Sequence, residues 1–309
     1  MNHPRWAPEL RSPPNDGLLE TLARVARLGE NYALRIAPKD EGWVSAEELV
    51  HGGTVFEHVV ERLSPGRGDP ATRRAVGSQF VLLYLRFIWP VVAAFALERR
   101  VPDVAAENLL VRFDGAGWPS AFALAHPRFA VLECDPSAHE ASSVAGDEAE
   151  LLRWLHDRSI DRNAAPLVET VRKRLLTSGT ALWGNVAAAF AHPLLWHVQH
   201  VAPESAAIVR DAEALLGRGK APNLGDQVRF LRVVQDDEEW TVHARRTCCL
   251  RWCLPGKSRC DDCPLVREPQ AYEFLRARLT EAIAHGEALR RELGLEVRRR
   301  DLKQDLHSA

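Results

Sequence analysis

Hydrophobic residues recur at helical spacing over most of the chain. Leu18, Leu22, Val25 and Leu28 share one face of a predicted helix from about Leu18 to Leu28. The same spacing predicts further helices at about Thr54–Leu63, Asp147–Leu155, Pro166–Leu176, Gly179–Ala191, Ser205–Leu216, Leu224–Val234 and Pro269–Leu293. The pattern therefore indicates a largely helical protein.

Polar residues, glycines and prolines mark the ends of these segments. Asp69 followed by Pro70 predicts an N-cap and a first-turn proline for a long apolar helix. Two breaks, His192-Pro193 and 217–222, are expected to separate helices, and Gly294 to stop the last one. Capping pairs are predicted at Thr54 with Glu57 and at Asp147 with Glu150.

The segment from Phe80 to Leu97 is almost wholly apolar and close to the length that crosses a bilayer. It contains Arg86 and Pro90, and a charge near the centre of a spanning helix would be costly. We therefore favour a kinked helix buried in a globular core over a membrane span.

Between about 102 and 133 the pattern changes to short apolar runs bounded by turn residues. Asn108–Phe113 and Trp118–Leu124 flank a glycine turn and predict paired strands, and Phe129–Glu133 and Glu239–His243 predict two more. Cys134, at the end of one strand, is expected to be a small core residue. The predicted fold class is α+β, mostly α-helical with a small antiparallel sheet and a C-terminal cysteine-rich loop.

The chain divides into four predicted parts. Residues 1–16 form a proline-rich flexible arm, 17–240 a folded scaffold with a substrate-docking region, 241–268 a cysteine motif, and 269–309 a helix with a charged tail. The net charge of −2 leaves no global field to recruit nucleic acid. The N-terminus lacks the pattern of a secretory signal, so we expect a cytoplasmic protein, with peripheral membrane association left open.

Five of the six cysteines lie between Cys248 and Cys263, which requires a sulfur-selective explanation. Disulfides belong to oxidising compartments, and the chain shows no export signal. Zinc would suit the pair Cys260 and Cys263, but Cys248 and Cys249 are adjacent, and adjacent side chains in extended backbone point to opposite faces. A [2Fe-2S] cluster, which takes four thiolates, fits this spacing better, with Pro255-Gly256 supplying the turn between the two halves.

The motif also resembles a known family. Cys248-Cys249, ten residues, Cys260, two residues and Cys263-Pro264 are similar to the signature of the FhuF-like ferric siderophore reductases. The flanking Arg245-Arg246-Thr247 and the upstream Leu182-Trp183-Gly184-Asn185 are similar too. Cys253 departs from the family pattern and leaves five thiols for four positions.

The resemblance implies a ferric-chelate reductase whose Cys248, Cys249, Cys260 and Cys263 hold a [2Fe-2S] cluster, with Cys253 spare. One electron would pass to Fe³⁺ held in a siderophore, and Fe²⁺, which oxygen ligands bind less well, would be released in the cytoplasm. No catalytic residue beyond the cluster is expected. The implied partners are a ferric siderophore and an electron donor of ferredoxin or flavin type.

Basic residues surround the cysteines and are candidates for substrate docking. Arg245, Arg246 and Arg251 would attract anionic ferric chelates, or would only keep a solvated loop soluble. Trp183 is a candidate for stacking on the chelate, with ordinary packing as the alternative. Surface or core positions are expected for the histidines that the chain also carries nearby, His192, His197, His200 and His243.

Two other functions remain open at this point. The same cysteines would hold structural zinc in an interaction module. A relative of the siderophore synthetases would need a nucleotide site, and the chain shows no recognisable phosphate-binding glycine loop.

Overall fold

The computed structural model describes residues 17–64, 69–202, 204–217, 223–235, 238–260, 263–266 and 270–292. The chain is 57% helical and carries small sheets, so the predicted α+β class is confirmed. The predicted arm at 1–16, Asp261-Asp262, the helix stop at Gly294 and the charged tail lie outside the described residues.

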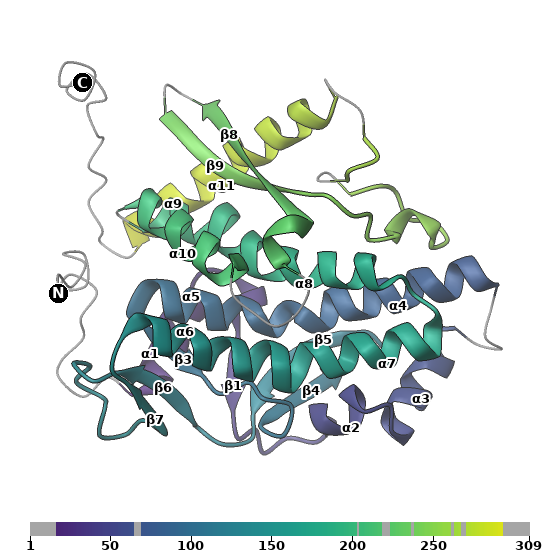
Figure 1. Cartoon of the computed structure of the whole chain (residues 1–309), viewed down its shortest axis with the longest axis horizontal. Helices are drawn as coiled ribbons and strands as arrows, with labels where there is room; N and C mark the ends of the chain where they lie inside the picture. Colours follow the sequence, from purple (N-terminus) through teal and green to yellow (C-terminus); the bar gives the residue numbers. More distant parts are fainter. Residues whose placement is uncertain are drawn as a thin grey trace.

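The elements follow one another in the order given in Figure 1. The helices are α1 Leu18–Ala26, α2 Ala46–Val50, α3 Thr54–Leu63, α4 Pro70–Tyr84, α5 Ile88–Glu98, α6 Glu148–His156, α7 Ala165–Leu175, α8 Gly179–Pro193, α9 Gln199–Val201, α10 Ser205–Gly217 and α11 Gln270–Glu292. The strands are β1 Leu34–Ile36, β2 Trp43–Ser45, β3 Arg100–Pro102, β4 Leu109–Phe113, β5 Pro119–Leu124, β6 Phe129–Leu132, β7 Ser143–Ala145, β8 Val228–Gln235 and β9 Glu238–Arg245.

Helices α4 and α5 form the apolar axis of the main core. Asp69 caps α4 by accepting from the amides of Ala71 and Thr72, as predicted. A 3-10 turn, Leu85–Phe87, joins the two helices just before Pro90. A proline in a helix removes one amide donor and collides with the carbonyl four residues earlier, so the α-helical ladder is interrupted there.

The stretch from Pro70 to Glu98 is long and apolar enough to cross a membrane, and it is the one such helix among the described residues. In its most apolar window, 78% of the residues are buried inside the protein. Helices α1, α7 and α8 pack against α4 or α5, so neighbouring elements of the same chain cover this surface. The burial supports the core-helix interpretation.

The sheets are small and lie beside the helical layer (Figure 1). One has the order β1-β5-β4-β2 and another β3-β6-β7, while β8 and β9 form a separate antiparallel pair. The predicted hairpin of Asn108–Phe113 with Trp118–Leu124 is confirmed as β4 and β5, paired antiparallel. Parallel pairing of β1 with β5 and of β6 with β7 was not expected from the sequence.

A second, smaller core lies between the β8–β9 hairpin and α11. Trp196, Val233, Trp240, Val242, Leu275 and Leu279 form it. Trp196 comes from a π-helical segment, Leu194–Val198, that continues α8. The hairpin and α11 are thereby attached to the helical body, above α8 in Figure 1.

Two predicted elements are corrected. The helix predicted at Leu224–Val234 is instead a short 3-10 turn followed by β8, because Val228 and Val233 are buried by pairing with β9. The predicted break at His192-Pro193 is absent, since α8 runs through Pro193 into the π-helical segment and α9.

Two local predictions are also wrong. Thr54 is the first residue of α3 and makes no side-chain cap, because Gly53 holds the N-cap position. Cys134 is exposed rather than a core residue, because it follows β6 into a surface turn. At Asp147 the predicted cap is confirmed, since its carboxylate accepts from the amide of Glu150.

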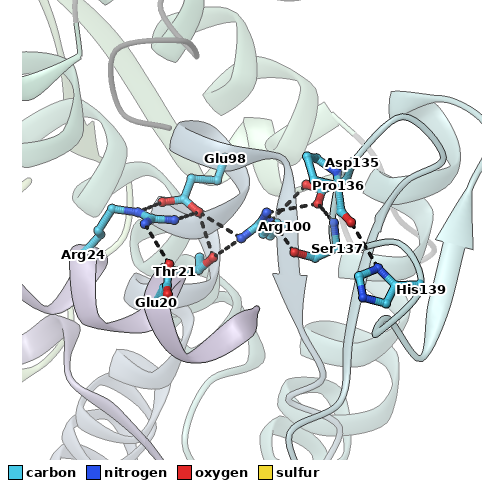
Figure 2. Close-up of polar contacts among 9 residues, drawn as sticks. All are labelled: Glu20, Thr21, Arg24, Glu98, Arg100, Asp135, Pro136, Ser137 and His139. Atoms are coloured by element: carbon cyan, nitrogen blue, oxygen red, sulfur yellow. Dashed lines mark hydrogen bonds and ion pairs between the residues drawn. The ribbon is translucent and has the colours of Figure 1, made fainter. Parts of the chain in front are cut away.

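A buried polar network joins the N-terminal helix to the second sheet (Figure 2). Arg100 donates to both carboxylate oxygens of Asp135 at 3.0 Å and to the hydroxyl of Thr21 at 3.0 Å. Thr21 and Arg24 both donate to Glu98. The side chain of Arg100 is 7% exposed and that of Asp135 11%, so water does not replace these contacts.

We predict that Arg100→Met lowers the free energy of unfolding by about 3 to 5 kcal/mol, because it leaves the buried carboxylate of Asp135 without a cation. Equilibrium unfolding in urea measures the change. Arg232→Met is the matched control, since Arg232 is 78% exposed and pairs with Glu239 at the surface. Equal costs for the two variants would show that the network does not stabilise the fold.

Candidate functional site

Helix α8 approaches the start of the cysteine loop so closely that only glycine fits at one position. A Cβ on Gly184 would lie 1.7 Å from the hydroxyl oxygen of Thr247 and 3.0 Å from its Cβ. Thr247 directly precedes Cys248. Gly184 therefore sets how near the loop lies to the helical body.

Polar contacts fix the same junction from two helices. Asn185 donates to the carbonyl of Ser78 at 2.8 Å, and its side-chain oxygen accepts from Arg245. Gln79 of α4 donates to the carbonyl of Cys249 at 2.7 Å. Asn185 is fully buried and Arg245 is 4% exposed, so the end of β9 is held by satisfied, dehydrated hydrogen bonds.

The backbone turns sharply after the two adjacent cysteines. Leu250 adopts a left-handed conformation at φ 60°, which is costly for a residue other than glycine, and its amide donates to the sulfur of Cys248 at 3.3 Å. The 3-10 turn Arg251–Cys253 follows. Gly256 at φ 68° completes the predicted Pro255-Gly256 turn, with the amide of Lys257 donating to the carbonyl of Leu254.

The four cysteines of the motif lie in two pairs, each combining one half of the motif with the other. The sulfurs of Cys249 and Cys260 are 3.0 Å apart. Cys248 is hydrogen-bonded to Cys263. Cys248 and Cys249 thus face different partners, in agreement with the alternation of adjacent side chains. Cys253 is half-buried in the 3-10 turn.

The thiols differ in acidity. The hydrogen bond with Cys260 is the main cause that lowers the pKa of Cys249 to about 6, and the guanidinium of Arg245 acts in the same direction against burial. Burial raises the pKa of Cys263 and of Cys253. Cys249 therefore has the greatest thiolate character of these three at neutral pH.

A cavity of about 490 Å³ opens beside one thiol pair. Cys249 and Cys260 form part of its wall, together with residues of α4, α8, β9 and α11. Two tryptophans, Trp89 and Trp118, supply aromatic surface. This volume lies in the range of small-molecule sites, so a compact ligand would sit against the cysteine sulfurs.

The histidines near the cavity are partly or fully buried. His192 lines the cavity, and burial, with Arg278 next in effect, holds its pKa well below the usual value. Burial also lowers the pKa of His197 to about 4 and of His200 to about 3. His243 lines the cavity and accepts from the indole N–H of Trp196 at 2.9 Å. Of the four histidines expected at surface or core positions, His200 and His243 are buried, and His192 and His197 are partly exposed.

The docking residues proposed from the sequence separate into two groups. Arg245 and Arg251 line the cavity. Arg246 does not; its Nε donates to the carbonyl of Val228. Trp183 packs against the main core and is not part of the lining.

The polar lining residues Gln79, Arg86 and Arg278 are among those that the sequence did not identify as part of the site. Arg86 carried a usable signal, because it interrupts an apolar run where a charge is costly. Arg278 comes from the last helix and carried none. Among the described residues, no set of three or more His, Cys, Asp or Glu side chains is arranged to hold a metal ion.

We predict that Gly184→Ala displaces Thr247 and costs about 1 to 3 kcal/mol of unfolding free energy through overpacking. Thiol modification of the metal-free protein should also become faster, because the loop is held less tightly. Gly179→Ala in the same helix is the control, since its nearest neighbour would be at 3.6 Å. If both variants behave alike, the close approach is not what positions the loop.

A second prediction concerns acid stability. Burial lowers the pKa of His200 from its ordinary value of 6.5 to about 3 in the folded protein. Between these two pH values the imidazole is protonated in the unfolded chain and neutral in the folded one. The contribution of the neutral His200 to the free energy of unfolding is complete above pH 6.5 and is lost as the pH falls toward 3. His200→Met should therefore reduce the slope of unfolding free energy against pH in this window by about 1.4 kcal/mol per pH unit. Urea titrations across the window measure the slope, and an unchanged slope would contradict the assignment.

Comparison with known proteins identifies the family of the chain. Residues 78–232 match the model of the family described as ferric iron reductase FhuF-like transporter. The match covers half of the chain; it includes Gln79, Arg86 and Asn185 and ends before the first cysteine of the motif. No curated protein matches the chain. The chain belongs to the FhuF-like ferric iron reductase family.

Proposed function

We propose that this protein is a ferric-siderophore reductase that passes one electron at a time from a [2Fe-2S] centre to chelated Fe³⁺. One observation carries the proposal: the thiol pair of Cys249 and Cys260 lines a cavity of about 490 Å³. A chelate in that cavity would lie directly against two of the proposed cluster ligands. Membership of a family of ferric iron reductases supplies the reaction class.

The thiols suit such a centre in number and kind, while the arrangement of the described side chains does not by itself form a metal site. Four cysteines in two cross-paired sets match the four thiolates that a [2Fe-2S] cluster takes, two for each iron. The lowered pKa of Cys249 favours the thiolate that binds metal. When bound, the cluster would supply a one-electron reductant beside the cavity.

The surrounding residues would adjust the charge and accessibility of this site. Arg245, next to Cys249, offsets the negative charge of the thiolates. Helix α4 holds the loop through Gln79 and the carbonyl of Cys249. Trp89 and Trp118 would cover part of a bound chelate and exclude water from it.

Release of iron would follow from coordination chemistry rather than from bond cleavage in the chelator. Fe³⁺ is a hard cation that oxygen ligands hold tightly, and Fe²⁺ is held less well. The chain then needs no nucleophile, and its residues only bind and orient the chelate. We further propose a cytoplasmic location, a ferredoxin- or flavin-type electron donor and no nucleic-acid partner.

We predict that protein purified without oxygen is red-brown and carries about two iron atoms per chain. Cys260→Ser should remove or strongly alter the visible absorption, because Cys260 belongs to a thiol pair. Cys253→Ser is the matched control and should leave the absorption intact, because Cys253 lies outside both pairs. Metal analysis and visible spectroscopy of the three proteins provide the measurement.

The opposite pattern for the two variants would overturn the ligand assignment. A colourless preparation with one zinc per chain would replace the reductase by a zinc-binding interaction module that uses the same cysteines.

A further inference from the structure

Among the described residues, those that line the cavity beside the thiol pair include five cations and no carboxylate. Arg86 comes from the turn between α4 and α5, Arg245 from β9 and Arg278 from α11. Arg251 and Lys257 of the cysteine loop also line the cavity. Positive charge therefore converges on one space from segments far apart in the sequence.

These cations lack the anionic partners that other arginines of the protein have. Arg24, Arg99 and Arg100 each make an ion pair with a partly or fully buried carboxylate. In the described part of the chain, none of the five lining cations pairs with a carboxylate within 4.0 Å. Grouping like charges around a partly dehydrated space is unfavourable unless an anion enters it.

Arg86 is the clearest case. It is half-buried, and among the described residues its side chain makes neither a hydrogen bond nor an ion pair. Its position follows from Pro90, which interrupts the α-helical ladder at the turn that carries Arg86. A core helix thus presents an unpartnered guanidinium to the cavity.

Arg278 is held by neutral groups. Its Nη2 lies 3.1 Å from Nε2 and 3.4 Å from Nδ1 of His192 and donates to whichever of the two is unprotonated. Its guanidinium carbon lies 4.7 Å from the ring centroid of Trp196. These contacts orient the guanidinium without neutralising it. Arg86 and Arg278, from separate elements, therefore leave two oriented positive groups facing the same space.

We infer that the cavity binds an anionic ferric chelate, of catecholate or carboxylate type, with Arg86 and Arg278 as its anion receptors. The inference rests on the proposed function and names the substrate class of that site. Catecholate and carboxylate complexes of Fe³⁺ carry net negative charge, whereas a tris-hydroxamate complex is neutral. Guanidinium groups bind such oxygen anions through charge-assisted hydrogen bonds.

The same charges would favour the reduction itself. One electron transferred to the chelate converts Fe³⁺ to Fe²⁺ and makes the complex more negative by one charge. Fixed cations beside the complex stabilise that product more than the starting complex. Adding an electron to an anionic chelate is opposed by the charge that it already carries. The cations that line the cavity therefore favour the reduction of an anionic chelate more than that of a neutral chelate.

Binding can be measured apart from reduction by replacing Fe³⁺ with Ga³⁺, which forms similar complexes and is not reduced. Tryptophan fluorescence of the full-length protein, titrated with the Ga³⁺ tris-catecholate complex, should show saturable binding that weakens with salt. Arg86→Gln and Arg278→Gln should each weaken it about ten- to one-hundredfold, and Arg86→Lys should recover part of the loss. The neutral Ga³⁺ tris-hydroxamate complex should bind much more weakly and show little dependence on these arginines.

Arg229→Gln is the matched control, because Arg229 is exposed on β8 and does not line the cavity. Circular dichroism melts establish that each variant is folded. Equal binding of both Ga³⁺ complexes, or no effect of Arg86→Gln and Arg278→Gln, would overturn the inference. If the inference fails in this way but the protein reduces the ferric hydroxamate, the reductase proposal remains intact. If the catecholate complex binds but its ferric form is not reduced, the anion site is retained and the reductase proposal is rejected.

Discussion

The close contact between α8 and the cysteine loop is the constraint on which the candidate site depends. Gly184 has no side chain because Thr247 occupies that space, and Asn185, the next residue, joins Ser78 of α4 to Arg245 of β9. These contacts join segments that are 60 or more residues apart in the chain. They place Cys248 and Cys249 against the helical body, where Gln79 holds the carbonyl of Cys249.

Some features of the candidate site lower the stability of the fold, and a buried polar network at another place in the protein raises it. Leu250 takes a left-handed conformation, and five cations line a cavity without ion pairs in the described structure. On the far side of the main core, Arg100 joins Thr21 to Asp135 in a satisfied buried network. Strained backbone and unpaired charges that lie around one cavity are typical of functional sites. There a bound ligand supplies the interactions that the side chains lack.

The sequence predicted elements whose signals are local. Helical spacing identified α1, α7 and α11, and Asp69 with Pro70 marked the start of α4. The prediction of a helix after Leu224 was wrong. The apolar residues of this segment fit helical spacing, but its valines are buried only when the segment pairs with β9 as a strand. Pairing between distant segments is not encoded in the spacing of one segment.

The candidate site shows the same division. The cysteine spacing and the glycine turn were readable because their residues are close in sequence. The cavity was not, because Arg86 and Arg278 meet only through the packing of α4, α5, α8 and α11. Trp183 and Arg246 were predicted to dock the substrate because they lie in or next to the motifs in the sequence. Neither residue lines the cavity.

The central claim is that the cysteine site delivers electrons to a ferric chelate bound beside it. Its most direct test is a single-turnover experiment, in which reduced protein is mixed without oxygen with one equivalent of a ferric tris-catecholate complex and a ferrous-specific chelator. The account predicts that the visible absorption of the oxidised protein returns while one Fe²⁺ per chain is captured. A protein that stays reduced with this complex and with the ferric tris-hydroxamate complex as well, or that reoxidises without releasing Fe²⁺, would contradict it.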